Sequence, residues 1–283
     1  MQYSIQNEKL SITVDTLGGE LVSVCYEGKQ RQWQNDNGSW PGHAPLLFPN
    51  CGQCHIVVDG KEYLFKAHGF ARKSEFTLVE QGADFLTLRL CADENTKACY
   101  PFDFIFSVTY RIDGNLLTIE YNVENPADTP LWYSCGAHDS FALPEGMGAY
   151  ELLFEKDEQF LHCPHTGVGT LTGATEDWGN GKTFALPEAF LSDGKTVIFK
   201  QIRSNKLWLQ LKNGEKKAEI TFDSFDNLLL WRPNSGANMI CIEPWKNLPD
   251  VDGVLNVEFS QKKGVERVEA KSAHKIVRTI RYY

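Results

Sequence analysis

The chain has 283 residues, of which 42% are hydrophobic and 12% aromatic, and its formal net charge is -9. A chain of this length buries roughly 70 to 75% of its unfolded surface, so one large core without disulfides is feasible. The negative charge argues against a nucleic-acid partner, because binding to a phosphate backbone is driven by clustered Lys and Arg.

The amino-terminal residues MQYSIQNEKL contain neither the basic nor the apolar part of a secretion leader. No run of about 18 apolar residues occurs, so no membrane span is expected. We therefore expect a cytoplasmic protein. Its eight cysteines are expected to be reduced, and most are interpreted as small apolar core residues.

The dominant periodicity of the sequence is two, which is typical of strands with one buried face. In chain order, the first strands are expected around 12–14, which should open the sheet, and around 86–90. Apolar residues then alternate over 102–112 and 117–123, on the two sides of the turn signal Asp113-Gly114-Asn115. This pattern predicts a long antiparallel hairpin.

The segment 164–187 contains five glycines and is expected to form a long loop over one face. A second hairpin is expected over 207–222, because Asn213-Gly214 readily takes the positive φ values of tight turns. The basic tail, 271–281, is expected to be a closing strand with its Lys and Arg side chains in solvent. The many strands predict an all-β fold, a large antiparallel β-sandwich formed by residues 1–283 as a single domain.

Three short segments concentrate side chains that transfer protons or bind hydroxyl groups. They are His68-Gly-Phe-Ala-Arg72, Gly136-Ala-His138-Asp-Ser-Phe141 and Ile242-Glu243-Pro-Trp245. Two imidazoles and one carboxylate are what proton transfer to and from the oxygens of a sugar would need.

Glu243 follows an apolar run, at a point where Pro244 is expected to stop the hydrogen-bond ladder of a strand. Partial burial beside Trp245 would raise the pKa of this carboxyl towards the range useful for a base. The alternative is a strand-end glutamate paired with Lys246.

In this order and at these separations, the three segments resemble the aldose 1-epimerase (galactose mutarotase) family, as a shorter bacterial-type member with the His-Gly-Phe-Ala-Arg motif. The resemblance implies the galactose mutarotase β-sandwich and a cofactor-independent interconversion of the α and β anomers of an aldohexose. It also implies Glu243 as general base, His138 as the acid facing the ring oxygen, and His68 as a second imidazole in the same region.

Four further residues are candidates for binding the sugar. Arg72 offers five donors for hydroxyls or an anionic group, with an ion pair to a buried carboxylate as the alternative. Trp245 is a candidate platform for the apolar face of a sugar. Gln53 stands where the family often has an arginine, and a neutral amide cannot neutralise a phosphate. Asp193 is a candidate for holding a sugar hydroxyl, with a turn role before Gly194 as the alternative.

Two alternative functions stay open. The pair Ala71-Arg72 also resembles the hexose-6-phosphate branch of the family. A non-catalytic carbohydrate-binding protein on the same fold is the other alternative, because Gln53 departs from the family pattern and Asp139 replaces the proline that frequently follows the second histidine. The expected partner is a small sugar, with no nucleic acid and no membrane, and the chain is expected to be a monomer or a weak homodimer.

The segment Cys51-Gly-Gln-Cys54-His55 matches the short attachment pattern of a c-type haem and also provides half of the ligands of a zinc site. Haem attachment needs export and a second axial ligand, and the sequence suggests neither. Cys163 and His165 are the nearest candidates for the other two ligands of a zinc site. Because nothing else supports such a site, we expect neither a metal nor a cofactor.

Overall fold

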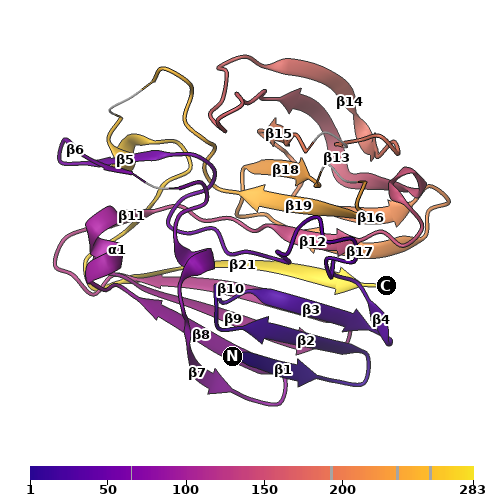
Figure 1. The fold of residues 1–283 in the computed structure, drawn as a ribbon, viewed down its shortest axis with the longest axis horizontal. Coiled ribbons are helices and arrows are strands. Elements are labelled where there is room, and N and C mark those ends of the chain that lie inside the picture. The colour runs from indigo at the N-terminus through magenta and orange to yellow at the C-terminus, as the bar shows by residue number, and fades with distance from the viewer. Residues whose placement is uncertain (65, 192–193, 234–235, 255–256) are drawn as a thin grey trace.

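The computed structural model describes residues 1–64, 66–191, 194–233, 236–254 and 257–283. The regular secondary structure of the described residues is almost wholly antiparallel strand, as Figure 1 shows. The predicted all-β sandwich is therefore confirmed. In this part of the chain, no helix has the length and apolar character that crossing a membrane requires.

The strands of the structure have the following bounds. They are β1 (Gln2–Gln6), β2 (Leu10–Asp15), β3 (Leu21–Tyr26), β4 (Lys29–Gln30), β5 (His55–Val58), β6 (Lys61–Leu64), β7 (Thr77–Gln81), β8 (Phe85–Cys91), β9 (Ile105–Asp113), β10 (Leu116–Glu124), β11 (Leu131–Tyr133), β12 (Asp139–Ala142), β13 (Tyr150–His162), β14 (Glu176–Ala185), β15 (Val197–Lys200), β16 (Lys206–Leu211), β17 (Lys216–Thr221), β18 (Asn227–Trp231), β19 (Met239–Trp245), β20 (Glu266–Val268) and β21 (Ala273–Tyr282). The helices are α1 (Glu94–Cys99) and the short 3-10 turns η1 (Ala71–Lys73), η2 (Met147–Ala149) and η3 (Phe259–Gln261).

The main sheet has 13 strands in the order β12-β19-β18-β15-β13-β16-β17-β21-β10-β9-β8-β7, with β14 paired to β13. A separate sheet of four strands, β1-β2-β3-β4, shares one hydrophobic core with this sheet. Ile12 and Val14 of β2 are buried in that core together with Leu88 of β8 and Ile119 of β10. The two sheets therefore form the layers of the sandwich (Figure 1).

Both predicted hairpins are present. β9 and β10 pair across the turn at Gly114, which has a φ of 55°. β16 and β17 pair across Gly214, with a φ of 91°. The positive φ values explain glycine at both turns, since other residues rarely adopt them. The strand predicted at 12–14 is β2, but it does not open the sheet, because β1 precedes it and pairs with it.

The prediction of a long loop over 164–187 is wrong for its second half, because 176–185 form strand β14 against β13. This strand lies at an edge and most of its side chains are exposed, so it lacks the alternation of apolar and polar residues that marks a half-buried strand. Gly179 and Gly181, with φ values of 96° and 142°, fit a pairing that contains register shifts.

The basic tail is the predicted closing strand, β21, but one of its cations does not face solvent. Arg278 is buried between Ile276 and Ile280 on the inner face of the strand. Its guanidinium donates to both carboxylate oxygens of Asp139, over 2.5 and 3.0 Å. Arg278 can be buried because Asp139 neutralises its charge. Asp139 is 139 residues away in sequence, so the residues around Arg278 could not predict this pairing.

Candidate active site

Strand β19 is buried on both faces, and its alternation separates the core from a polar site. Ile240 and Ile242 point into the main core of the sandwich. Cys241, Glu243 and Trp245 therefore point to the opposite face, because successive strand residues alternate. Alternate residues of MICIEPW therefore pack in the core, and the residues between them face the candidate site.

The segment that leads into β12 places His138 opposite Glu243. Asp139 pairs with Ile242 in the β12–β19 ladder, and the same register continues to a bridge between Gly136 and Trp245. Residues directly opposite in an antiparallel pair project from the same face. Gly136 is required here, since a Cβ at this position would lie 2.8 Å from Cys51 Sγ.

The prediction that Pro244 stops the ladder is wrong. Strand β19 runs on to Trp245, and the Pro244 carbonyl accepts a hydrogen bond of 3.0 Å from the Ala137 N–H. A proline lacks only the donor, so its acceptor can still join the strand to the chain that carries His138.

The Nε2 atom of His138 lies 3.3 Å from Oε1 of Glu243. The two side chains expose only 11% and 2% of their surface. Lys246 forms an ion pair with Glu266 instead. The alternative in which Glu243 is a surface partner of Lys246 is therefore wrong.

His68 joins this pair from a turn on another part of the chain. Its Nδ1 accepts a hydrogen bond of 3.2 Å from the Gly52 N–H, so the proton of the neutral ring is on Nε2. The ring meets His138 and Trp245 edge-on, at centroid distances of 5.7 and 5.1 Å. His68 has a φ of 71°, an uncommon conformation that its neighbours must hold in place.

Two tryptophans that were not predicted enclose His138. The ring of Trp40 lies 5.3 Å from the imidazole at an interplanar angle of 30°, and Trp231 lies 5.7 Å away at 69°. Trp231 pairs with Cys241 in the β18–β19 ladder and so belongs to the same face as Glu243. The acid–base pair is therefore closed in by aromatic rings.

Burial sets the charge of the site. It raises the pKa of Glu243 well above 4.5, and the nearby indole of Trp245 offsets part of that rise. The indole Nε1 of Trp245 has no hydrogen-bond partner of normal geometry among the described residues. Burial lowers the pKa of His138 to about 3. It also lowers the pKa of His68 well below 6.5, with smaller contributions from His138 and Arg72. Burial therefore favours the uncharged form of both groups, the protonated carboxyl of Glu243 and the neutral imidazole of His138.

Arg72, through its positive charge, makes a small contribution to the lowered pKa of both imidazoles. Its Nη2 donates a hydrogen bond of 2.9 Å to the Ala67 carbonyl, and its buried Nε has no partner among the described residues. Burial lowers the pKa of the guanidinium, and the charge of Glu20 opposes this shift. In the described ranges, no carboxylate lies within 4.0 Å of it.

Gln53 follows Gly52, the residue that holds His68, and its carbonyl accepts from the Asp250 N–H over 2.9 Å. This places Gln53 in the loop beside the site, while what its side chain binds stays a prediction. Asp193 lies outside the described residues.

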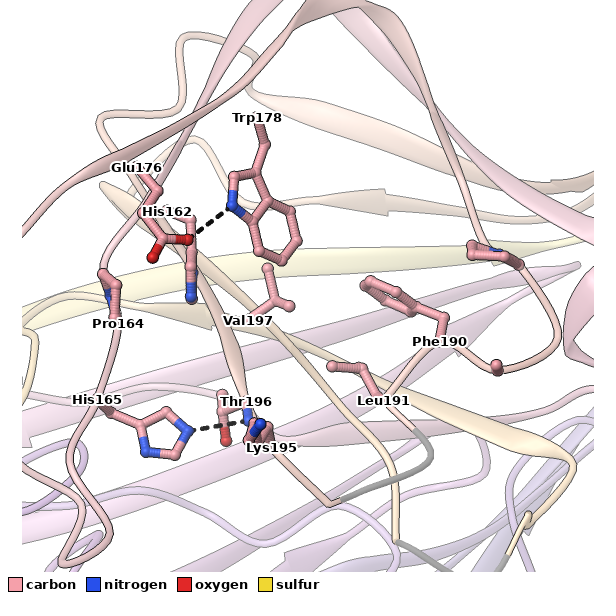
Figure 2. A pocket seen from close by; sticks show the side chains of 12 residues that line it. His162, Pro164, His165, Glu176, Trp178, Phe190, Leu191, Lys195, Thr196 and Val197 are labelled. Atoms are coloured by element: carbon pink, nitrogen blue, oxygen red, sulfur yellow. Dashed lines mark hydrogen bonds between the residues drawn. The ribbon is translucent and has the colours of Figure 1, made fainter.

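A cavity of about 710 Å³ is lined by residues of β13, β14 and β15 and by the segments that connect them (Figure 2). Trp178 and Phe190 give it apolar walls, and Trp178 donates to Glu176 over 3.0 Å. Its lining continues to Thr196, whose N–H donates to His165 Nε2 over 3.2 Å. The cavity is large enough for a small organic ligand.

The cavity and the acid–base pair belong to different strands of the main sheet. Val197 of β15 lines the cavity, and β18 pairs with both β15 and β19, so roughly two strand spacings, or about 10 Å, separate β15 from β19, which carries the carboxylate. The ring of Trp231 contacts His138, and its indole N–H donates over 3.1 Å to the carbonyl of Gly194, the residue before Lys195 of the cavity lining.

The residues considered for zinc do not gather into one group. Cys51 and Cys163 are buried in an apolar cluster, and Cys54 lies 3.3 Å from the Lys262 ammonium. Among the described residues, His138, Cys241 and Glu243 form the one set of three metal-ligating side chains with their ligand atoms close together.

Solved structures of the galactose mutarotase-like class have this fold. A galactose mutarotase related enzyme from Lactobacillus acidophilus superimposes with a TM-score of 0.91 at 24% identity, covering 100% of this chain and 97% of that one. A galactose mutarotase-like protein from Lactobacillus casei ATCC 334 gives a TM-score of 0.90 at 24% identity, with 100% of both chains covered. At these identities the similarity establishes the fold alone.

The chain belongs to the aldose 1-epimerase family, whose sequence profile matches residues 1–258. Its sequence is also similar to the plasmid-encoded protein LacX of Lactococcus lactis subsp. lactis. The two are 29% identical over 292 aligned positions, which cover 93% of this chain and 97% of the relative.

Proposed function

We propose that the protein is an aldose 1-epimerase that interconverts the α and β anomers of an aldohexose by acid–base ring opening and closure, without a cofactor. The observation that carries this proposal is the buried Glu243–His138 pair, 3.3 Å apart on one face of the sheet. We also place the chain among the shorter bacterial-type members that have the His68-Gly-Phe-Ala-Arg72 motif.

The reaction needs one proton removed and one delivered. The base takes the proton of the C1 hydroxyl, a C1=O double bond forms, the bond from C1 to the ring oxygen breaks, and the acid protonates that oxygen. Rotation about the C1–C2 bond presents the other face of the aldehyde, and the reverse steps close the ring. Each positioned group contributes about 10²- to 10⁴-fold to the rate.

We assign the base to Glu243 and the acid to His138. In the buried pair the proton rests on Glu243, because burial disfavours both charged forms. Transfer of this proton to His138 gives a carboxylate and an imidazolium, which attract each other strongly in a low-dielectric site. Hydroxyl groups of a bound sugar stabilise both charges and so favour the reactive form.

His68 and Arg72 are proposed to bind the sugar oxygens. The proton on His68 Nε2 is available to donate, because Nδ1 is occupied by the Gly52 N–H. Arg72 retains an unpartnered buried Nε among the described residues. Trp245 presents an aromatic surface beside His68, suited to the C–H face of a pyranose.

Polarimetry with fresh α-glucose and α-galactose tests the proposal. The protein should accelerate mutarotation, and Glu243→Gln should lower kcat/KM by at least about 10²-fold. Glu266→Gln is the matched control, because this glutamate pairs with Lys246 away from the site, and it should retain the activity. Binding of sugar without acceleration would favour the non-catalytic alternative.

A hexose 6-phosphate is the second candidate substrate. It is favoured by Arg72, whose guanidinium has no carboxylate within ion-pair distance in the described chain. If the substrate is phosphorylated, Arg72→Ala should remove the preference for the phosphate ester and reduce turnover of the neutral sugar less. Equal losses for both sugars would exclude this role.

We further propose that the protein acts in the cytoplasm as a monomer or weak homodimer. Sedimentation at several concentrations would measure the association, and cell fractionation would establish the compartment.

A further inference from the structure

Cys241 has no part in the proposed proton transfer, yet it belongs to the same buried group as the two residues that do. The ligand atoms of His138, Cys241 and Glu243 all lie within 4.8 Å of one another, and all three residues are buried. The closest pair, His138 Nε2 and Glu243 Oε1, is 3.3 Å apart.

The sheet register explains why this group forms. Cys241 and Glu243 are two residues apart on β19, and so they project from one face about 7 Å apart along the strand. His138 is opposite Glu243, and Ser140 is opposite Cys241. The position of each side chain is thus fixed by a ladder rather than by a flexible loop.

Two polar atoms on this face are not engaged elsewhere. Ser140 and His138 are both buried. Within the described chain, Ser140 Oγ and His138 Nδ1 are buried without a hydrogen-bond partner. Leaving such groups unpaired costs about 1 to 3 kcal/mol each, so the face is polar but incompletely satisfied, as expected of a site that binds something.

The donor set selects a particular kind of ion. Zinc binds a thiolate, an imidazole nitrogen and a carboxylate oxygen at roughly 2.0 to 2.3 Å in tetrahedral geometry, which puts neighbouring donor atoms about 3.3 to 3.7 Å apart. Side-chain rotations that move the donor atoms of this group by about 1 Å would bring them to that spacing. Magnesium and calcium prefer oxygen ligands alone and fit the group poorly.

We propose that His138, Cys241 and Glu243 form a binding site for a thiophilic divalent cation such as Zn²⁺, which competes with the sugar reaction for the same two proton-transfer groups. On binding, the thiol and the carboxyl group each release their proton to solvent, and the imidazole coordinates through Nε2. The metal then occupies the electron pairs that the acid–base reaction requires. Inhibition of mutarotation by the metal rests on the proposed function, whereas binding of the metal does not.

Titration of the purified full-length protein with Co²⁺, after removal of metal by a chelator, tests binding without any sugar. One Co²⁺ per chain should bind, with the near-ultraviolet charge-transfer absorption of a cobalt thiolate and the visible bands of a tetrahedral site. Added Zn²⁺ should displace it. Absence of the thiolate absorption from protein that binds Co²⁺, or no binding, would overturn the proposal.

Substitution separates the metal site from the proton-transfer pair. Cys241→Ser should weaken Co²⁺ binding by more than about 100-fold, which exceeds the usual loss when a residue that only hydrogen-bonds to a metal ligand is changed. It should also abolish the thiolate absorption. Cys163→Ser, at a buried cysteine of the neighbouring apolar cluster, should leave both unchanged. Circular dichroism checks the folding of each variant, and Cys241→Ala repeats the test without the hydroxyl.

The mutarotase assay then tests the competition. Micromolar Zn²⁺ should inhibit the wild-type protein, whereas Cys241→Ser should keep its activity and resist inhibition. Equal inhibition of both proteins would overturn the role of Cys241. A protein that binds Co²⁺ through the thiolate but does not accelerate mutarotation would contradict the proposed function and leave the metal site standing.

Discussion

At the scale of single residues, burial decides which of the site groups carries the proton. Glu243 and His138 are 3.3 Å apart, and burial shifts their pKa values in opposite directions, upward for the carboxyl and downward to about 3 for the imidazole. The two opposed shifts favour the state in which the pair holds one proton, on the carboxyl. The pair is therefore best treated as one unit with two macroscopic pKa values.

This arrangement predicts an unusual pH dependence for mutarotation. The active pair holds one proton, and it gains a second only as the pH falls towards about 3, the pKa of His138. kcat/KM should therefore not fall through pH 6.5, where an ordinary histidine titrates. It should fall on the alkaline side, as the pH rises through the raised pKa of Glu243 and the remaining proton is lost.

Polarimetric kcat/KM values between about pH 4 and 9 would measure this profile, because kcat/KM reports the ionisations of the free enzyme. Glu243→Asp, which keeps the carboxyl group but shortens it, serves as the comparison and should move the alkaline limb. An acid limb centred near pH 6.5 in the wild-type protein would contradict the prediction.

The sequence could identify the reacting residues but not their surroundings. His68, His138 and Glu243 stand in short motifs, and the structure brings all three together. Trp40 reaches His138 from a loop almost a hundred residues earlier, so no local pattern marks it. Cys241 could have been found, because it stands two residues before Glu243 and a period of two puts both on one face.

At the scale of elements, the turn before η1 positions His68. Gly69 has a φ of 68°, and a Cβ there would lie 2.2 Å from the Phe48 carbonyl oxygen. Gly60, in the turn between β5 and β6, has nearly the same φ, 72°, with no atom within 4 Å of a Cβ. A substitution at Gly60 therefore measures the energetic cost of a side chain in this backbone conformation alone, and one at Gly69 adds the cost of the close contact with Phe48.

Alanine substitution at each glycine tests this difference. Gly60→Ala should lower the free energy of unfolding by about 1 to 2 kcal/mol, the cost of a left-handed conformation. Gly69→Ala should cost about 3 kcal/mol or more, and should lower kcat/KM by roughly 10²-fold by displacing His68. Urea unfolding and polarimetry measure both effects, and equal losses in the two variants would contradict the role of the Phe48 contact.

The buried ion pair between Asp139 on β12 and Arg278 on β21 joins two elements that are distant in the main sheet. Burial raises the pKa of Asp139, and Arg278 opposes that rise. Asp139→Ala should cost about 3 to 5 kcal/mol of unfolding free energy, because it leaves a buried guanidinium uncompensated. The double variant Asp139→Leu/Arg278→Met should recover most of this loss in urea unfolding, because neither charge remains buried. Failure to recover would mean that the ion pair stabilises the fold beyond mutual neutralisation of its charges.

The same ion pair shows why some elements could not be predicted correctly. The alternation of β21 was visible in the sequence, but the partner that permits a buried Arg278 is a tertiary contact. For β14 the difficulty was the opposite, since its exposed side chains and glycines resemble a loop until its backbone pairs with β13. Half-buried hairpins such as β9–β10 were predictable because packing on one face fixes their pattern.

At the scale of the whole molecule, the last strand of the chain holds the main sheet together. β21 pairs along nine positions with β10 and along four with β17. In the sheet order it lies between β7–β10 and the strands that carry Glu243 and the cavity. The two parts of the sheet therefore depend on one shared element, which supports the expectation of a single domain over residues 1–283.

A single domain of this kind should unfold in one cooperative transition. Tryptophan fluorescence and far-ultraviolet circular dichroism should give the same urea midpoint, because β21 pairs with both parts of the main sheet and couples their unfolding. Deleting residues 271–283 should abolish the transition, since the exposed edges of β10 and β17 would be left without partners and prone to aggregation. Two separate transitions in the full chain, or a truncated chain that still unfolds cooperatively, would instead mean that the part containing β7–β10 folds independently of the part that contains the active site.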